Sequence, residues 1–327
     1  MTNLYDVPNS DIEKYCHYSE DVVIANTLLI KDNNIIINYS PDFADTAREL
    51  KKNITSYDLP IFSTPVFTIK FSWCWNYHIN FIQAVPNILF YMKLKKTIPD
   101  LLIDVQRNFT DLYKDLFKIF DIDETSIVSI DNMVVKKLYY STFCTEYYNG
   151  CGKISIYHTM IIDAIRKYFL QDIYLTNINT KPSRLIYINR LNNLAGFNRY
   201  IVNNDQVIEH LTNKGFETIT FEAMSLKEKF TSTINAKIII TPVGANIINL
   251  CIGDISQVEK IILICPNERY HGYLKFNKEQ LSSLTGVSPN KIEVLLCDIY
   301  DNGIVSPGDQ VNKPHIVDLK ELDNLIG

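Results

Sequence analysis

From Arg184 onward, short apolar segments alternate with amphipathic segments, and this alternation constrains the fold more than any other feature of the chain. Short, continuously apolar runs are typical of strands buried on both faces, and the amphipathic runs between them are typical of helices. A chain with this alternation folds into a parallel sheet with helices on both faces. We expect strands at 185–190, 216–220, 237–241, 260–265 and 291–297, and helices at 204–214, 225–235, 245–252 and 277–285.

The first half of the chain is less regular, but it also mixes strands with helices. Residues 21–39 have the pattern of a β-hairpin that turns at Asp32–Asn34, and a longer helical stretch follows at 78–96. Residues 175–183 are polar, contain Pro182 and show no periodicity, so we place an interdomain linker there. We also expect strands at 101–105, 126–130 and 134–141, helices at 110–120 and 157–169, and a short C-terminal helix within 316–327.

Length and composition fit two packed domains and exclude several classes of protein. The chain has 327 residues, of which 46% are hydrophobic, and this suffices for two cores. The net charge of −5 includes no blocks of basic residues, so nucleic acid is not an expected partner. Neither a signal peptide nor a membrane-spanning run is recognisable, and we expect a cytoplasmic protein. The seven cysteines lack the spacing of zinc ligands or of a disulfide framework.

The segment KIIITPVGANIINLCIG, residues 237–253, carries a strong functional signal. It places Pro242, Gly244 and Ala245 between an expected strand and an expected helix. Small residues at this point let a ligand approach the backbone, and the start of a helix offers unpaired N–H groups to phosphate or sugar oxygens. The same residues also suit a tight turn and close packing of the helix on the sheet. Both interpretations stay open, and the chain contains neither a G-x-G-x-x-G nor a Walker motif.

Two arginines and an asparagine follow the first strand of the regular part. Arg190 ends that strand, Arg199 lies in the loop after it, and Asn203 comes just before the next expected helix. Arginines at this position could clamp a diphosphate, because the forked donors of a guanidinium match phosphate oxygens. Surface arginines are also commonly solvated without any ligand, and Asn203 suits the N-cap of a helix in any protein.

Three further signals have a structural interpretation beside the functional one. Glu228 could hydrogen-bond the hydroxyls of a ligand, but the sequence favours its role in a capping box with Ser225. His78 lies among aromatic residues and could act as a general base, although a histidine in an apolar stretch is more often structural. Asp121 and Asp123 form an acidic pair of the kind that holds a metal, but their position between a helix and a strand favours a polar turn. We therefore expect no metal site.

In their order along the chain, these segments resemble the motifs of glycosyltransferase family 61. IYINR, Arg199 and IVNND resemble the family's strand-Arg, second Arg and Asn-Glu step, and PVGANIINL resembles its Pro-His-Gly-Ala motif with the Asn that follows. The resemblance covers roughly residues 70–300 and is strongest at 185–250. His78 is one residue farther from Pro86 than in the family. The chain further departs from the family pattern at Val243, Asn204, Lys229 and Gln83, where the family has His, Glu, Gln and often a carboxylate.

The resemblance implies an α/β fold of GT-B architecture, in which two Rossmann-like domains face each other across a cleft. Its expected division is an acceptor-side domain at 1–174, the linker at 175–183, a nucleotide-sugar domain at 184–315 and a helix at 316–327 that packs back. It also implies an inverting transferase that works without a metal or other cofactor. Such an enzyme moves a hexose or pentose from a nucleoside diphosphate sugar, with UDP as the expected nucleotide, to a hydroxyl of a glycan or glycoprotein.

The resemblance also assigns residues to two roles. The expected catalytic base is His78, with Asp163 and Glu146 as alternatives. Donor binding is expected at Arg190, Arg199, Asn203, Glu228, Pro242, Gly244, Ala245, Asn246 and Asn249.

Two other functions stay open because fold alone does not fix activity. One is a nucleotide-sugar epimerase or phosphorylase. The other is a glycan-binding protein with a decayed site, which would agree with Val243 and Gln83.

Overall fold

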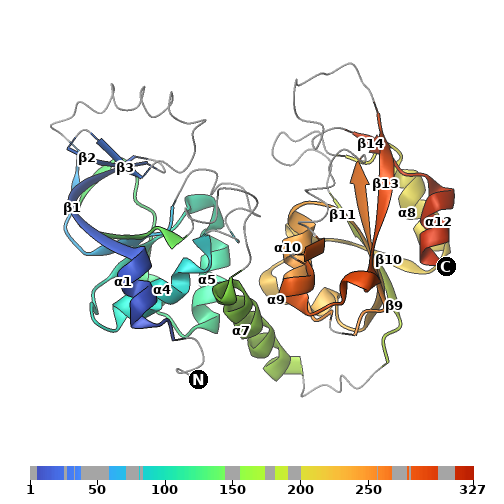
Figure 1. Cartoon of the computed structure of the whole chain (residues 1–327), viewed down its shortest axis with the longest axis horizontal. Helices are drawn as coiled ribbons and strands as arrows, with labels where there is room; N and C mark the ends of the chain where they lie inside the picture. The colour runs from blue at the N-terminus through green and yellow to red at the C-terminus, as the bar shows by residue number, and fades with distance from the viewer. Residues whose placement is uncertain are drawn as a thin grey trace. The chain divides into compact units, whose positions relative to one another are not determined.

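The chain folds into two compact units, Met1–Ala164 and Ile165–Gly327, each built on a sheet of its own (Figure 1). This confirms the α/β fold class. The linker predicted at 175–183 lies mostly outside the described residues, so the domain division proposed there stays a prediction. The computed structural model describes residues 6–25, 28–32, 34–37, 59–70, 81, 84–143, 155–173, 181–190, 200–255, 257–266, 278–279, 281–300 and 314–327.

The sheet of the second unit is parallel except at one edge. Its strands are β9 (Arg184–Asn189), β10 (Phe216–Thr220), β11 (Ala236–Pro242), β12 (Lys260–Pro266), β13 (Ile292–Ile299) and β14 (His315–Ile316). They lie in the order β10-β9-β11-β12-β13-β14, and only β14 pairs in the antiparallel direction. The five parallel strands follow the flavodoxin-like order 2-1-3-4-5 of doubly wound sheets. All the strands predicted for this part of the chain are therefore confirmed.

Helices cover both faces of this sheet, as the alternating pattern predicts. On one face lie α8 (Asn204–Asn213) and α12 (Leu319–Ile326), and on the other lie α9 (Leu226–Ser232) and α10 (Ala245–Ile252) (Figure 1). Residues 281–285 are also helical, within the helix predicted at 277–285. Two short 3-10 helices, η7 (Phe221–Ala223) and η9 (Pro289–Lys291), precede α9 and β13. The doubly wound arrangement explains why ligand sites are expected at the carboxyl edge of this sheet.

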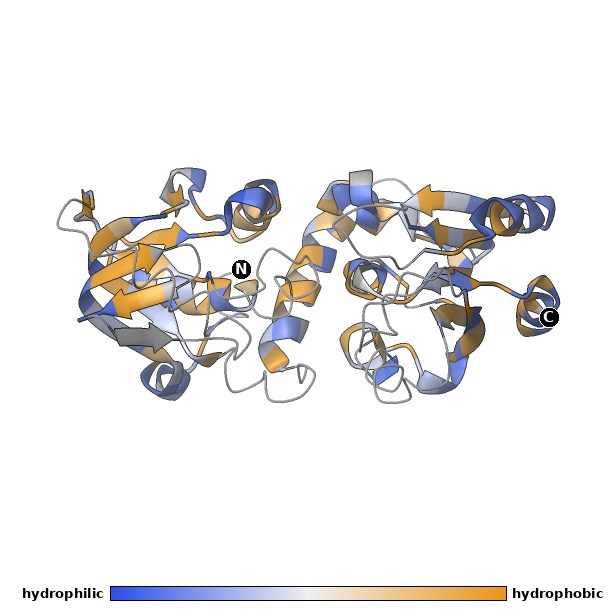
Figure 2. Cartoon of the chain, turned by 90° about the horizontal axis from the view of Figure 1, so that it is seen from above, coloured by the Kyte–Doolittle hydropathy of each residue, from blue (hydrophilic) through white to orange (hydrophobic). Residues whose placement is uncertain are grey.

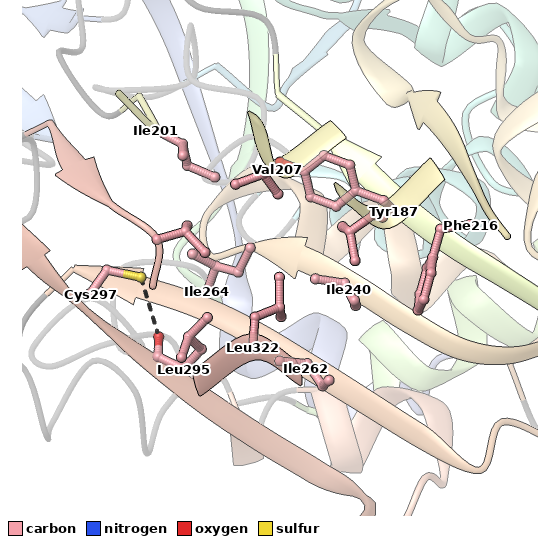
Figure 3. Close-up of a cluster of buried hydrophobic side chains, with 12 residues drawn as sticks. Tyr187, Ile201, Val207, Phe216, Ile240, Ile262, Ile264, Leu295, Cys297 and Leu322 are labelled. Carbon is pink, nitrogen blue, oxygen red and sulfur yellow. Dashed lines mark hydrogen bonds between the residues drawn. The ribbon is translucent and has the colours of Figure 1, made fainter. Parts of the chain in front are cut away.

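The core between this sheet and the α8–α12 face explains the apolar strands. Ile240, Ile262 and Ile264 project from β11 and β12 and are fully buried (Figure 3). Val207 of α8 and Leu322 of α12 pack against them. Central strands of such a sheet are covered on both faces, so their sequence is continuously apolar rather than alternating. Each buried isoleucine stabilises the fold by about 1.5–3 kcal/mol.

The sheet of the first unit is mixed. Its strands are β1 (Cys16–Ala25), β2 (Leu28–Lys31), β3 (Asn34–Ile37), β4 (Ile61–Phe62), β5 (Val66–Thr68), β6 (Leu102–Asp104), β7 (Ile127–Val128) and β8 (Met133–Ser141). They lie in the order β3-β2-β1-β8-β5-β6-β7, and β4 also pairs with β8. β1 is antiparallel to β2 and β8, whereas β5 is parallel to β6 and β8. The predicted hairpin is confirmed: β2 and β3 pair around Asp32, which has a positive φ of 48°.

The helices of the first unit surround an aromatic core. Phe90, Phe143 and Tyr157 pack with ring centroids 5.1–5.4 Å apart. Helix α4 begins directly after Pro86, whose fixed φ suits the start of a helix. The helical elements are α1 (Asn9–Tyr15), α4 (Asn87–Lys95), η3 (Arg107–Phe109), α5 (Thr110–Ile119), η4 (Glu124–Ser126) and α7 (Ile156–Ile173). The boundary between the two units falls inside α7.

The distribution of hydropathy follows this architecture. Figure 2 shows hydrophobic residues concentrated on the strands of both sheets, whereas the exposed helices carry hydrophilic residues on one side. None of the helices that the structure describes combines the length and the apolar character needed to cross a bilayer.

Candidate functional site

The order of the strands in the second unit places a topological switch point between β9 and β11. The connection after β9 leads through α8 to β10 at one edge, whereas the connection after β11 leads through α10 to β12 on the other side. The two connections leave the sheet in opposite directions, and in α/β sheets such a point is where a crevice at the carboxyl ends of the strands binds ligands. Arg190 directly follows β9, and Val243 and Gly244 directly follow β11. The topology thus brings both predicted motifs to one edge of the sheet.

Gly244 is required by its backbone conformation. Its φ of 130° and ψ of −144° lie in a region that is essentially restricted to glycine. The residue precedes α10, and its carbonyl accepts the first helical hydrogen bond from Ile247 N–H at 3.0 Å. The interpretation as a tight turn is therefore confirmed. A ligand is compatible with it, because the N–H groups of the first turn of a helix have no partner within the helix.

Two asparagines of α10 are the most informative side chains at this site. Asn246 and Asn249 are both 4% exposed in a helix whose other described side chains are apolar. They are three residues apart and therefore share one side of the helix. Among the described residues, the Nδ2 atom of Asn246 and the Oδ1 atom of Asn249 are buried without a hydrogen-bond partner. A buried polar group without a partner costs about 1–3 kcal/mol, so a polar ligand is a physical reason for both.

Hydrogen bonds fix the backbone at the ends of β9 and β11. Pro242 closes β11 opposite Ile264 of β12, and Val243 N–H donates to the Ile264 carbonyl at 3.0 Å. Arg190 is half-buried, and its N–H donates to Asn189 Oδ1 at 2.8 Å. These bonds fix the backbone on both sides of the switch point. The structure therefore offers a rigid frame to a ligand at this edge.

Asn203, which is predicted to bind the donor, makes hydrogen bonds within the second unit. Asn203 precedes α8, but its side chain does not cap the helix. Its Nδ2 donates to the carbonyl of Val317 at 2.9 Å, and its Oδ1 accepts from Val317 N–H at 3.0 Å. Both polar atoms of Asn203 thus hold the segment that leads into α12.

Glu228 completes the capping box that the sequence favours. Its Oε2 accepts from Ser225 N–H at 2.8 Å, and Ser225 Oγ accepts from Glu228 N–H at 3.3 Å. The hydrogen bonds from Ser225 lower the pKa of the Glu228 carboxyl. A ligand is not needed to explain this residue.

Several predicted site residues cannot be placed. His78, Glu146 and Arg199 lie outside the described residues, and so does the side chain of Ala245. Asp163 lies half-buried in α7, within the first unit. The assignment of the catalytic base therefore stays a prediction.

The acidic pair at Asp121 and Asp123 forms the polar turn that the sequence favours. Asp121 has a positive φ of 55°, and Asp123 accepts from Thr125 N–H at 2.9 Å as the N-cap of η4. This hydrogen bond lowers the pKa of the Asp123 carboxyl. In the described part of the chain, no group of three or more His, Cys, Asp or Glu side chains is arranged to hold a metal ion.

A buried ion pair in the first unit was not predicted from the sequence. Lys70 Nζ lies 2.8 Å from Asp104 Oδ1, and the two side chains are 4% and 0% exposed. Thr68 Oγ1 and Ile130 N–H donate to the same carboxylate at 2.9 and 2.7 Å, and Lys70 also donates to the Ile130 carbonyl. The pair ties together the carboxyl ends of β5 and β6. An aspartate at the end of the apolar run LLIDV was the available signal.

A comparison with protein families identifies a match that covers most of the chain. The family model described as glycosyltransferase 61 matches residues 15–254, well over half of the chain. No curated protein matches the chain.

Proposed function

The chain belongs to the glycosyltransferase 61 family, and we propose that it transfers a sugar from a nucleoside diphosphate sugar to a hydroxyl of a glycan or glycoprotein. Family membership supports the transferase activity itself. For the donor we propose a UDP-linked hexose or pentose, and for the reaction inversion at the anomeric carbon in a GT-B architecture. The observation that carries donor binding is the pair of buried asparagines in α10 whose amide atoms have no partner among the described residues.

The chemistry at the switch point suits a nucleoside diphosphate. The start of α10 offers N–H groups and the positive end of a helix dipole to phosphate oxygens. Arg190, at the end of the neighbouring strand, would add a forked pair of donors. Asn246 presents an amide donor and Asn249 an amide acceptor, which complement hydroxyl or base groups of a nucleotide. These groups together would bind both the charged and the neutral parts of the donor.

The proposed reaction is a direct displacement. The oxygen of the acceptor hydroxyl forms a bond to the anomeric carbon while the bond from that carbon to the diphosphate breaks. A base takes the acceptor proton, and His78 is the proposed base, with Asp163 and Glu146 as alternatives. Arg190, Arg199 and the start of α10 would stabilise the negative charge on the departing diphosphate. The proposal therefore calls on no metal ion.

A donor screen tests this function. The chain is incubated with UDP-, GDP- and ADP-sugars, with and without a panel of glycan acceptors, and the released nucleotide is measured by chromatography. We expect UDP release that depends on the acceptor, together with a product of inverted anomeric configuration in its NMR spectrum. Interconversion of the sugar without acceptor would instead indicate an epimerase, and UDP binding without any turnover would indicate a glycan-binding protein. Failure to bind any nucleoside diphosphate at millimolar concentration would contradict the proposal.

A further inference from the structure

A groove runs along the outer edge of the second sheet, away from the switch point between β9 and β11. Its volume is about 670 Å³, and it is bordered by the consecutive residues 294–299 of β13 and by Asp318, Glu321, Asn324 and Leu325 at α12. Successive side chains of a strand point to opposite faces. Six consecutive lining residues therefore mean that the edge of β13, rather than one of its faces, forms one side of the groove. Asp318, the N-cap of α12, and three residues of α12 recur at helical spacing and form the other side.

The edge of β13 that faces this groove is largely unpaired. On its inner side, β13 pairs with β12 from Ile292 to Cys297. On its outer side, β14 pairs only with Asp298 and Ile299. No strand in the described part of the chain pairs with the outer side of β13 between Ile292 and Cys297. Such an edge presents N–H and C=O groups that an extended peptide can satisfy by adding a strand.

The groove is acidic. Asp298, Asp318 and Glu321 border it, and none of the three forms an ion pair with a described lysine or arginine. All three carboxylates lie close enough to Cys297 to affect its thiol. Burial is the main reason that the pKa of this thiol is raised to about 12, and the negative charges of the three carboxylates raise it further. By contrast, Glu293 lies one residue before the groove and pairs with Lys260 at 3.5 Å.

We propose that this groove binds a basic, extended segment of a partner protein, which adds as a strand to the outer edge of β13. Its lysine or arginine side chains would lie on the α12 side of the added strand, against Asp318 and Glu321, and its apolar side chains on the other side, against Val294. Asp298, at the end of the groove, adds to the negative charge that attracts the segment. Residues 294–297 of β13 border the groove, have no partner strand on the outer side among the described residues and span about 13 Å, so about four residues of the segment can pair with them. Negative charge disfavours nucleic acid at this surface. The interaction is independent of sugar transfer and goes beyond the proposed function.

Peptide titrations of the full chain test the proposal. The probe is a fluorescent hexapeptide of alternating valine and lysine, and its binding is followed by anisotropy at low ionic strength. One control peptide carries glutamate in place of lysine, and a second keeps the lysines but has proline in place of valine, which removes the N–H groups needed for strand pairing. We expect binding of the valine–lysine peptide alone, with slower hydrogen exchange of the β13 amides in its presence.

A matched pair of protein variants links this binding to the groove. Asp298→Asn/Glu321→Gln removes two groove carboxylates and leaves Asp318, which caps α12, in place. Glu209→Gln/Glu222→Gln removes two exposed carboxylates of the same unit outside the groove. We expect the first variant to weaken peptide binding by about tenfold, and the second to leave it unchanged.

Three outcomes would overturn the proposal. They are the absence of peptide binding, equal binding of the proline peptide, and equal loss of affinity in both variants. If the native chain does not bind the peptide, a further measurement is whether the groove variant self-associates. Self-association would then mean that the carboxylates only keep the β13 edges of two copies apart.

Discussion

At the scale of single residues, substitutions of Arg190 can show whether this side chain binds a ligand or stabilises the fold. It follows β9 at the carboxyl edge of the sheet, where a diphosphate is proposed to bind. We expect Arg190→Ala to weaken UDP binding by about 1.5–3 kcal/mol, the range for hydrogen bonds to charged groups, and to leave the melting temperature nearly unchanged. Arg190→Lys should restore only part of the affinity, because an ammonium lacks the forked donors. Calorimetry and thermal melting measure both effects, and a variant that melts early but binds UDP normally would contradict this role.

Gly253 is required because its neighbours leave no room for a side chain, and not because of its backbone conformation. Its φ of −66° is open to any residue, but a Cβ atom there would lie 2.1 Å from Thr233 Oγ1 and 3.0 Å from Thr233 Cβ. Thr233 is fully buried at the end of α9, so it has little room to move. We expect Gly253→Ala to lower the free energy of unfolding by about 1–3 kcal/mol, as overpacking does. Urea denaturation checks this, and a double-mutant cycle with Thr233→Ala should reveal a favourable coupling. Independent, additive effects would mean that the two residues do not clash.

At the scale of elements, the Lys70–Asp104 pair joins the strand ends of the first unit. Removing one partner of a buried ion pair leaves a charge without compensation, and this costs about 3–5 kcal/mol. We expect such a loss in Lys70→Met, measured by chemical denaturation. Lys70→Met/Asp104→Leu should be more stable than the single variant, although Thr68 and the Ile130 N–H then lose their acceptor. A double variant less stable than Lys70→Met would show that the carboxylate acts mainly through its other hydrogen bonds.

A second contact between elements, between α8 and α12, predicts that the stability of the fold depends on pH. Asp323 of α12 accepts from His210 of α8 at 2.7 Å and lies 3.1 Å from Lys214 Nζ. The hydrogen bond to His210 is the main reason that the pKa of the Asp323 carboxyl is lowered. A lowered pKa in the folded state means that this stabilisation is present above the unfolded pKa of about 3.9 and is lost as the pH falls through the lower folded value.

The measurement compares the native chain with Asp323→Asn between pH 6 and pH 3. We expect the free energy of unfolding to fall more steeply toward pH 3 in the native chain than in the variant. The difference should be small, because both side chains are partly exposed. Equal slopes in the two proteins would show that α12 is held to α8 by apolar packing alone.

At the scale of the whole molecule, local periodicity predicted the second unit well and the first unit only in part. The central strands β11 and β12 are buried on both faces, so their continuously apolar sequences identify them directly. In the first unit, β1 pairs with β8 although more than a hundred residues separate them, and no local pattern encodes such a pairing.

The same limit applies to the candidate site. Gly244 and Arg190 could be placed at the carboxyl edge because each directly follows a predicted strand. Glu228 could be assigned to a capping box because its partner is three residues away. The contacts of Asn203 with Val317 join residues 114 positions apart, and no local pattern could predict them. Asn246 and Asn249 were expected at the donor site from the family resemblance, but only three-dimensional packing reveals that Nδ2 of Asn246 and Oδ1 of Asn249 are buried without a partner among the described residues.

The central claim is that α10 and the strand ends beside it bind a nucleoside diphosphate, and Asn249→Leu tests it most directly. The substitution replaces a buried amide, whose Oδ1 has no partner among the described residues, with an apolar side chain of similar size. The measurement combines thermal melting of the unliganded chain with a calorimetric titration of UDP, and Asn213→Leu, at an exposed position of α8, is the control. We predict that Asn249→Leu raises the free energy of unfolding by about 1–3 kcal/mol and sharply weakens UDP binding. A variant that loses stability and binds UDP like the native chain would contradict the account.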